Sequence, residues 1–272
     1  MHSYSIKINS DTMNNRKKIF LVSGAFVNAN SWANWKVYFE SKGYEIIIPV
    51  WPSKEGSVEE LRKKHPDSIL GNLRLSELFK FYIELIKQEE EKPIAIGHSV
   101  GGLIVQLLLQ ENLLLMGIAI HSVPPKGVTS FHYSFYKALW KPFGIFKSKK
   151  MPHLMSLKEW QYAFTNDMSF NEQKDSYDNY LIPESRRIIR GLFSNSAKVD
   201  YSKKQRPLLF VAGSNDNMMP ASLNFSNYKK YKYSPSLTDY KEFEGINHFV
   251  ISGKHWNETA TYILNWIKQH SG

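Results

Sequence analysis

A serine flanked by glycines is the strongest chemical signal in the chain. It is the central residue of a G-x-S-x-G pattern, Gly97-His98-Ser99-Val100-Gly101. An apolar run leads into the pattern and a segment of helical period leaves it, so the pattern predicts a tight strand-to-helix turn that exposes the Ser99 hydroxyl. Gly97 and Gly101 suit such a turn because only small residues let the flanking backbones approach closely. The plainer interpretation is a glycine-rich turn with an idle serine.

A serine hydroxyl is a weak nucleophile near neutral pH, so it needs an imidazole base that a carboxylate orients. Asp216 lies in a loop after an apolar run and shortly before Pro220, and His248 lies in the next such loop, before the last helical segment. Either could instead be an ordinary loop residue, Asp216 as a turn or capping residue and His248 at the surface. The chain has no cysteine, so a thiol nucleophile, a disulfide framework and cysteine-based metal sites are excluded.

The elements that must position these residues follow from the hydrophobic pattern. Short apolar runs rich in β-branched residues alternate with longer segments of helical period, which is typical of a parallel sheet built from β-α-β units. The predicted strands are residues 19–23, 45–50, 93–98, 116–122, 207–213 and 239–243, and the predicted helices are residues 31–41, 73–90, 101–112, 221–231 and 256–269. The predicted fold class is therefore α/β, with a mostly parallel central sheet flanked by helices.

Two long connections interrupt this alternation. Residues 124–204 are rich in proline and aromatic residues, and we expect a mainly helical lid inserted between strands and folded over the carboxyl edge of the sheet. Residues 51–73 should loop over the same edge. The predicted organisation is an N-terminal segment, 1–18, a core made of residues 19–123 and 205–272, and a lid insertion, 124–204.

The serine elbow, the order of the three residues and the loop Gly213-x-x-Asp216-x-x-x-Pro220 resemble the α/β-hydrolase fold family, from Ile19 onward. The resemblance implies a catalytic triad of Ser99, Asp216 and His248. It also implies an oxyanion hole formed by two backbone N–H groups, those of Val100 and Ala25. One residue departs from the family pattern: Ser23 stands where a histidine usually braces the oxyanion loop.

Several segments also resemble a group of bacterial α/β-hydrolases of unassigned substrate. They are residues 21–32, 124–128, 162–166 and 238–243. This likeness implies a bacterial enzyme and leaves its substrate open.

The reaction implied by the resemblance is hydrolysis of a carboxylic ester or related acyl bond through an acyl-enzyme. An acyltransferase or a cofactor-free perhydrolase would use the same triad, and a ligand-binding protein without catalysis is the non-enzymatic alternative. We expect no cofactor and no metal, because the sequence has no phosphate-binding loop and no histidines at ligand spacing. Candidate pocket residues are Phe26, His98, His121 and Trp140, and His121 could equally be a buried, hydrogen-bonded core histidine. The aromatic residues of the lid could line an acyl pocket or simply pack the lid against the core.

Positive charge is concentrated in the middle of the chain, within an overall net charge of +10. Residues 126–204 contain 14 Lys and Arg against 7 Asp and Glu, and residues 112–158 contain no acidic residue. The charge could attract an anionic substrate or only solvate the surface. We expect a small-molecule ester or acyl substrate, no nucleic acid, no stable membrane insertion and a cytoplasmic location, since residues 1–16 do not form a signal peptide.

Overall fold

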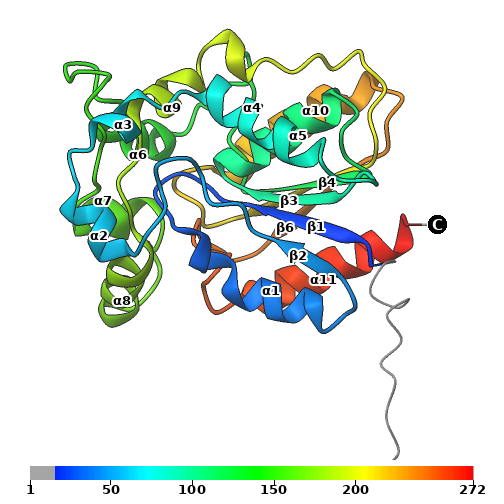
Figure 1. Cartoon of the computed structure of the whole chain (residues 1–272), viewed down its shortest axis with the longest axis horizontal. Helices are drawn as coiled ribbons and strands as arrows, with labels where there is room; N and C mark the ends of the chain where they lie inside the picture. Colours follow the sequence, from blue (N-terminus) through cyan, green and yellow to red (C-terminus); the bar gives the residue numbers. More distant parts are fainter. Residues whose placement is uncertain (1–15, 272) are drawn as a thin grey trace, which may run out of the picture.

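A six-stranded parallel sheet forms the centre of the computed structural model, which describes residues 16–271. Most of the predicted N-terminal segment, including the stretch in which a signal peptide was sought, therefore lies outside the described residues. The strand order is β2-β1-β3-β4-β5-β6 (Figure 1). Each strand overlaps a predicted run, with bounds β1 Lys18–Val22, β2 Glu45–Ile47, β3 Ile94–His98, β4 Met116–Ile120, β5 Leu208–Gly213 and β6 Thr238–Phe243.

Helices cover both faces of this sheet, which confirms the predicted fold class. Figure 1 shows α1 (Ala33–Glu40) and α11 (Trp256–Gln269) on one face. The other face carries α4 (Leu75–Ile86), α5 (Val100–Gln110) and α10 (Ala221–Lys230). Short 3-10 turns, Ala29–Trp32 and Tyr231–Tyr233, adjoin α1 and α10.

The central strands of the sheet are buried, so they provide a rigid support for the residues at their carboxyl ends. Every residue of β3 and β4 is buried. In register, Ile94 of β3 lies between Ile19 of β1 and Met116 of β4. Helix α5, which follows β3, buries all but its last residue and is apolar around most of its circumference, as expected of a helix enclosed by protein.

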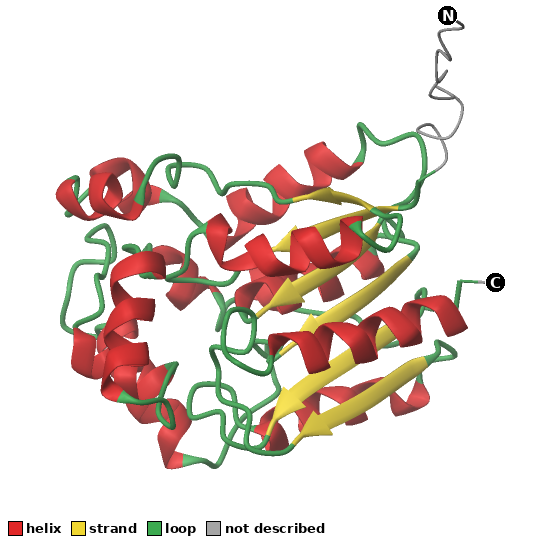
Figure 2. Ribbon diagram, turned by 90° about the horizontal axis from the view of Figure 1, so that it is seen from below, coloured by secondary structure: helices red, strands yellow, loops and turns green. Residues whose placement is uncertain are grey.

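The two long connections fold together beyond the carboxyl ends of the strands (Figure 2). The connection between β4 and β5 contains α6 (Tyr133–Phe143), α7 (Leu157–Ala163), α8 (Phe170–Tyr180), α9 (Arg186–Gly191) and a 3-10 turn, Asn195–Ala197. The connection between β2 and α4 contains two short helices, α2 (Val58–Lys63) and α3 (Ser68–Asn72). The insertion between β4 and β5 thus contains four α-helices joined by long loops, and both connections lie at the same edge of the sheet.

Arginine side chains from α9 fix the end of α6. The Arg186 guanidinium donates to the carbonyls of Lys141 and Pro142, and Arg190 donates to those of Phe143 and Gly144. Cations favour a helix C-terminus, where carbonyls lack partners within the helix.

None of the helices in residues 16–271 combines the length and the apolar character needed to cross a membrane.

Candidate active site

Ser99 occupies a sharp turn between β3 and α5, with φ 55° and ψ −116°. A non-glycine residue rarely adopts positive φ, and such strain is tolerated where the surrounding packing enforces it. A Cβ on Gly97 would lie 2.2 Å from the Gly101 carbonyl oxygen, and a Cβ on Gly101 would lie 2.1 Å from the Val22 oxygen. Both glycines are therefore required sterically, as the sequence pattern predicted.

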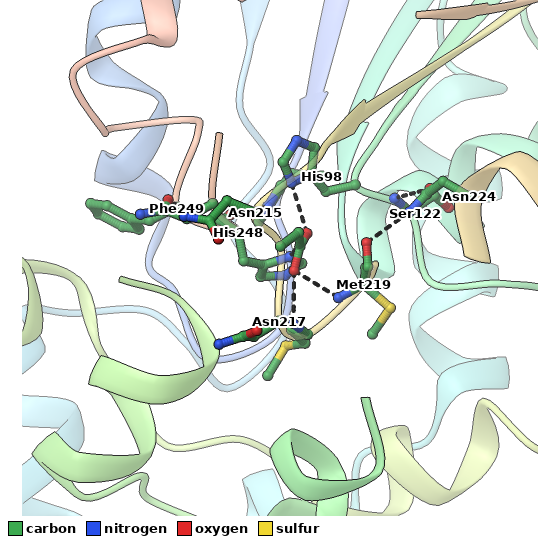
Figure 3. Close-up of polar contacts among 12 residues, drawn as sticks. His98, Ser122, Asn215, Asn217, Met219, Asn224, His248 and Phe249 are labelled. Carbon is green, nitrogen blue, oxygen red and sulfur yellow. Dashed lines mark hydrogen bonds and ion pairs between the residues drawn. The ribbon is translucent and has the colours of Figure 1, made fainter. Parts of the chain in front are cut away.

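Asp216 and His248 form a buried hydrogen-bonded pair close to this turn. His248 Nδ1 lies 2.7 Å from Asp216 Oδ2, and both side chains are fully enclosed. The other carboxylate oxygen, Oδ1, accepts the backbone N–H groups of Met218 and Met219 at 2.8 and 2.7 Å (Figure 3). The side chain of Asn224 links Ser122 N–H to the Met219 carbonyl and so ties the acid loop to the end of β4.

A second imidazole shares the same carboxylate oxygen. His121 directly follows β4 at φ 45°, and its Nδ1 lies 2.8 Å from Asp216 Oδ2. Burial alone would raise the Asp216 pKa, but the electrostatic attraction of His248 and the hydrogen bonds from His121 and His248 outweigh it and hold the pKa well below its usual range. Asp216 is therefore an ionised acceptor. Of the two interpretations of His121, the structure places it in a buried hydrogen bond.

The ionised carboxylate fixes the proton positions on the two histidines. Each Nδ1 must carry the hydrogen that it donates, so in the neutral ring Nε2 has the free lone pair. His248 Nε2 is buried and has no hydrogen-bond partner among the described residues. This is the tautomer that a general base needs.

The same geometry bears on metal binding. Ligand atoms of His121, Asp216 and His248 lie within 4.8 Å of one another, a grouping that could hold an ion. Distances of 2.7 and 2.8 Å are those of N–H donors to a carboxylate, however, and a protonated Nδ1 has no lone pair for a metal. The grouping therefore fits an acid–base network better than a metal centre.

His98 supports His248 from the other side. Its Nε2 donates to the His248 backbone carbonyl at 2.9 Å, and the two ring centroids are 4.7 Å apart (Figure 3). Burial, together with the neighbouring His248 and His121, holds the His98 pKa well below its usual value. His98 is therefore neutral, and its position depends on packing and one hydrogen bond.

The loop after β1 approaches Ser99 where the family resemblance places the oxyanion hole. A Cβ on Gly24 would lie 2.9 Å from the Ser99 Cβ, so only glycine lets this loop come so close. In the part of the chain that the structure describes, the backbone N–H groups of Ala25 and Val100 have no hydrogen-bond partner. Free N–H groups beside a nucleophile can stabilise a developing oxyanion.

A buried ion pair holds this loop in place, and it was missed by sequence reasoning. Glu184, from the insertion, accepts the N–H of Phe26, which follows Ala25 at φ 68°. The same carboxylate oxygen lies 2.5 Å from Lys54 Nζ, and both side chains are almost completely buried. Burial lowers the Lys54 pKa, although Glu184 acts the other way. Nothing in the local sequence marks two residues 130 positions apart as partners.

The insertion also pairs with the loop after β1 through backbone bonds. Val27 and Leu181 form an isolated antiparallel bridge. Ile182 N–H donates to the Phe26 carbonyl, and Asn28 N–H donates to the Tyr180 carbonyl. The loop that lacks the usual bracing histidine at Ser23 is therefore held by the insertion instead.

The predicted pocket residues are distributed differently from expectation. Phe26, His98 and His121 are buried, whereas Trp140 is 60% exposed and lines a groove on the insertion. An apolar cavity of about 160 Å³ does lie between α6 and the ends of β4 and β5. Its walls include Val123, Phe135, Tyr136, Leu139 and Met219. Only part of the aromatic set therefore faces this cavity, since Phe131 and Phe146 point into solvent.

Comparison with known proteins agrees with this architecture. A family model described as the alpha/beta hydrolase family matches residues 19–255. A monoacylglycerol lipase from Paleococcus ferrophilus has a similar structure, with a TM-score of 0.68 and 18% identity over 93% of this chain and 94% of that one. A methylesterase from Arabidopsis gives a TM-score of 0.65 and 15% identity over 93% and 99% of the two chains. Sequence comparison with the curated proteins gives no match.

Proposed function

This chain belongs to the alpha/beta hydrolase family, and on that premise we propose that it is a serine hydrolase that cleaves a carboxylic ester through an acyl-enzyme. One observation carries the proposal. The fully buried His248 donates Nδ1–H to the ionised Asp216 and keeps a free Nε2, near a serine at the strained turn that ends β3. His121 leaves its Nε2 without a partner in the same way, so the choice of His248 as the base also draws on its place in the loop after β6, where the family resemblance puts the catalytic histidine.

The proposed reaction follows from these groups. Ser99 Oγ attacks the ester carbonyl carbon while His248 Nε2 takes the hydroxyl proton. The bond to the alcohol oxygen then breaks, and His248 passes the proton to the departing alcohol. Water attacks the carbonyl carbon of the resulting acyl-Ser99 and loses a proton to His248. The bond between that carbon and Ser99 Oγ then breaks, His248 returns the proton to Oγ, and the acid is released. The N–H groups of Ala25 and Val100 would hold the oxyanion in both steps.

The Ser99 hydroxyl makes no hydrogen bond to His248, whose Nε2 is without a partner in residues 16–271. Catalytic hydrogen bonds are often long in the absence of substrate and shorten in the Michaelis complex. Ser99 is only 2% exposed, so substrate must reach it beneath the insertion.

A fluorophosphonate probe tests the proposal directly. It should label the wild-type protein at Ser99 and fail to label Ser99→Ala, and His248→Ala should be labelled slowly. Ser99→Ala should also lose turnover of p-nitrophenyl butyrate by at least about 10⁴-fold while remaining folded by circular dichroism. Labelling of Ser99→Ala, or activity above a tenth of wild type, would exclude this serine as the nucleophile.

The fate of the acyl group distinguishes hydrolysis from acyl transfer and perhydrolysis. In the presence of an alcohol or hydrogen peroxide, an acyltransferase or perhydrolase would give mainly the new ester or peracid, and a hydrolase mainly the free acid. A protein that binds esters without labelling by the probe would instead be a non-catalytic member of the fold.

A further inference from the structure

A groove between α6 and α7 has the features of a binding site. Its volume is about 530 Å³, within the range of small-molecule sites. We call it the α6–α7 groove, and its lining residues are Tyr133, Tyr136, Lys137, Ala138, Trp140, Lys141, Lys158, Glu159 and Tyr162. The lining therefore combines four aromatic rings with three lysines and one carboxylate.

The single carboxylate of the groove is already engaged. Glu159 accepts from His153 Nε2 at 2.8 Å and from the hydroxyl and N–H of Ser156, the residue that caps α7. Burial raises the Glu159 pKa, but these hydrogen bonds outweigh burial and lower it to about 2. Lys141 lies 3.8 Å from the same carboxylate. Glu159 is thus an ionised, hydrogen-bonded part of the wall, and Lys141 offsets its negative charge.

The other two lysines lack an acidic partner. Lys137 Nζ lies 3.9 Å from the centroid of the Tyr162 ring, a cation–π contact, and neither Lys137 nor Lys158 forms an ion pair with any residue between 16 and 271. Lysines held beside aromatic rings without a carboxylate can bind an anion whose body is apolar. The lining thus fits an anionic amphiphile.

The groove adjoins the catalytic loop. The Tyr162 carbonyl accepts Asn217 Nδ2 at 3.0 Å, and Asn217 directly follows Asp216. Tyr136 lines both the groove and the 160 Å³ apolar cavity. That cavity reaches Met219 and Val123, whose N–H groups bond to Asp216 Oδ1 and to the Ser99 carbonyl. A ligand in the groove would therefore lie one side chain away from the pocket next to the triad.

We propose that the α6–α7 groove binds the anionic end of the substrate, so that this protein selects esters bearing a carboxylate or phosphate on an apolar body. Lys137 and Lys158 bind the anion, and the rings of Tyr133, Trp140 and Tyr162 pack against the body. The inference rests on the proposed hydrolase function for its kinetic test and is independent of it for its binding test.

The kinetic test compares two esters of equal length, mono(4-nitrophenyl) glutarate and 4-nitrophenyl pentanoate. The double variant Lys137→Gln/Lys158→Gln should lower the ratio of kcat/KM for the anionic over the neutral ester by about tenfold or more, since charge-assisted hydrogen bonds are lost. The matched control is Lys147→Gln/Lys149→Gln, which removes the same charge from exposed positions outside the groove lining. This control should keep the wild-type ratio. An equal fall in both variants, or none in either, would overturn the proposal in favour of a solvated charged surface.

The binding test needs no turnover. Phenyl phosphate and phenylacetate are titrated against Ser99→Ala protein while tryptophan fluorescence is followed, with Trp140→Phe identifying the signal from the groove. Binding of either anion that is lost in the Lys137→Gln/Lys158→Gln background supports the proposal, and the stronger of the two identifies the anion. Absence of binding by both anions overturns it even if the esterase proposal stands.

Discussion

His121 and His248 donate their Nδ1 hydrogens to the same oxygen of Asp216, over 2.8 and 2.7 Å. With the two backbone donors on Oδ1, the carboxylate accepts four hydrogen bonds and donates none. Asp216 therefore holds together the ends of β4, β5 and the loop after β6, in addition to orienting one imidazole.

This arrangement predicts an unusual effect of Asp216→Asn. An amide has one acceptor oxygen, so its NH₂ group must face either two imidazole N–H groups or two backbone N–H groups. We expect a fall in kcat of about 10⁴-fold, because His248 loses its orienting acceptor. We also expect a loss of about 2–4 kcal/mol in the free energy of unfolding, because buried donors are left unpaired.

Urea titration and ester kinetics measure the two effects separately. The other acidic residues on β6 or directly after it are Asp239, Glu242 and Glu244. If the Asp216→Asn variant is nearly silent and one of these proves essential instead, the acid has been assigned to the wrong residue. The structure argues against Asp239, whose carboxylate accepts the Trp266 indole N–H at 2.7 Å.

Two buried neutral histidines predict a loss of stability in mild acid. Burial holds the pKa of His98 and of His121 below the ordinary value near 6.5. Below that value the unfolded chain takes up protons that the folded chain does not, so stability is present above about pH 6.5 and falls as the pH decreases. Each histidine should remove at most about 1.4 kcal/mol of the free energy of unfolding between pH 7.5 and 5.5. Urea unfolding at both pH values gives this slope, and a flatter slope in His98→Asn would identify its contribution. An unchanged stability would contradict the prediction.

Variants of the Lys54–Glu184 pair should affect the free energy of unfolding and kcat to different degrees. Lys54→Met alone leaves a buried, unpaired carboxylate and should cost about 3–5 kcal/mol. Lys54→Met/Glu184→Gln removes both charges and keeps one acceptor oxygen. If that oxygen accepts the Phe26 N–H, the amide NH₂ faces the Ser185 N–H, so kcat should stay close to the wild type while stability falls. Lys54→Met/Glu184→Leu also removes both charges and lacks that acceptor, so kcat should fall about 10–100-fold with little change in KM.

The test is to measure kcat for the two double variants under conditions in which circular dichroism shows equal fractions of folded protein. Equal kcat values in the Gln and Leu versions would mean that the pair stabilises the fold without positioning the oxyanion loop.

The Gly24→Ala variant tests how closely the loop after β1 must approach Ser99. The added methyl would lie 2.9 Å from Ser99 Cβ and 3.0 Å from His98 Nδ1, so the loop or the elbow must shift. A displacement of this size should lower kcat about 100-fold. Ser23→Ala is the control, because the Ser23 hydroxyl makes no hydrogen bond within the described residues and its removal should have little effect. Comparable losses in both variants would contradict this account.

Local patterns were enough to predict the sheet, its covering helices and the candidate nucleophile. The G-x-S-x-G pattern and the order of Asp216 and His248 depend on residues that lie at strand ends, where hydrophobic periodicity is informative. Three helices of the connections, α2, α7 and α8, were also within reach, since each begins at a Ser-x-x-Glu capping box. Their shortness and polar surfaces gave no clear helical period.

Other features arise only from tertiary contact. The partnership of Lys54 with Glu184, and of His121 with Asp216, joins residues 130 and 95 positions apart. The sequence also could not predict which lysines of the basic segment line a groove, because this depends on how α6 packs against α7. Trp140 was predicted to line a pocket, and it lines the α6–α7 groove and not the apolar cavity beside Met219.

The backbone pairing between the oxyanion loop and the insertion has a consequence for hydrogen–deuterium exchange. The amides of Asn28 and Ile182 lie outside the central sheet, yet each donates across the junction of two distant segments. Opening either amide requires the two segments to separate, so both should exchange together and far more slowly than the exposed stretch 145–150. Exchange in the 180–185 segment should therefore follow that of β1, in contrast to the exposed stretch 145–150 of the same insertion.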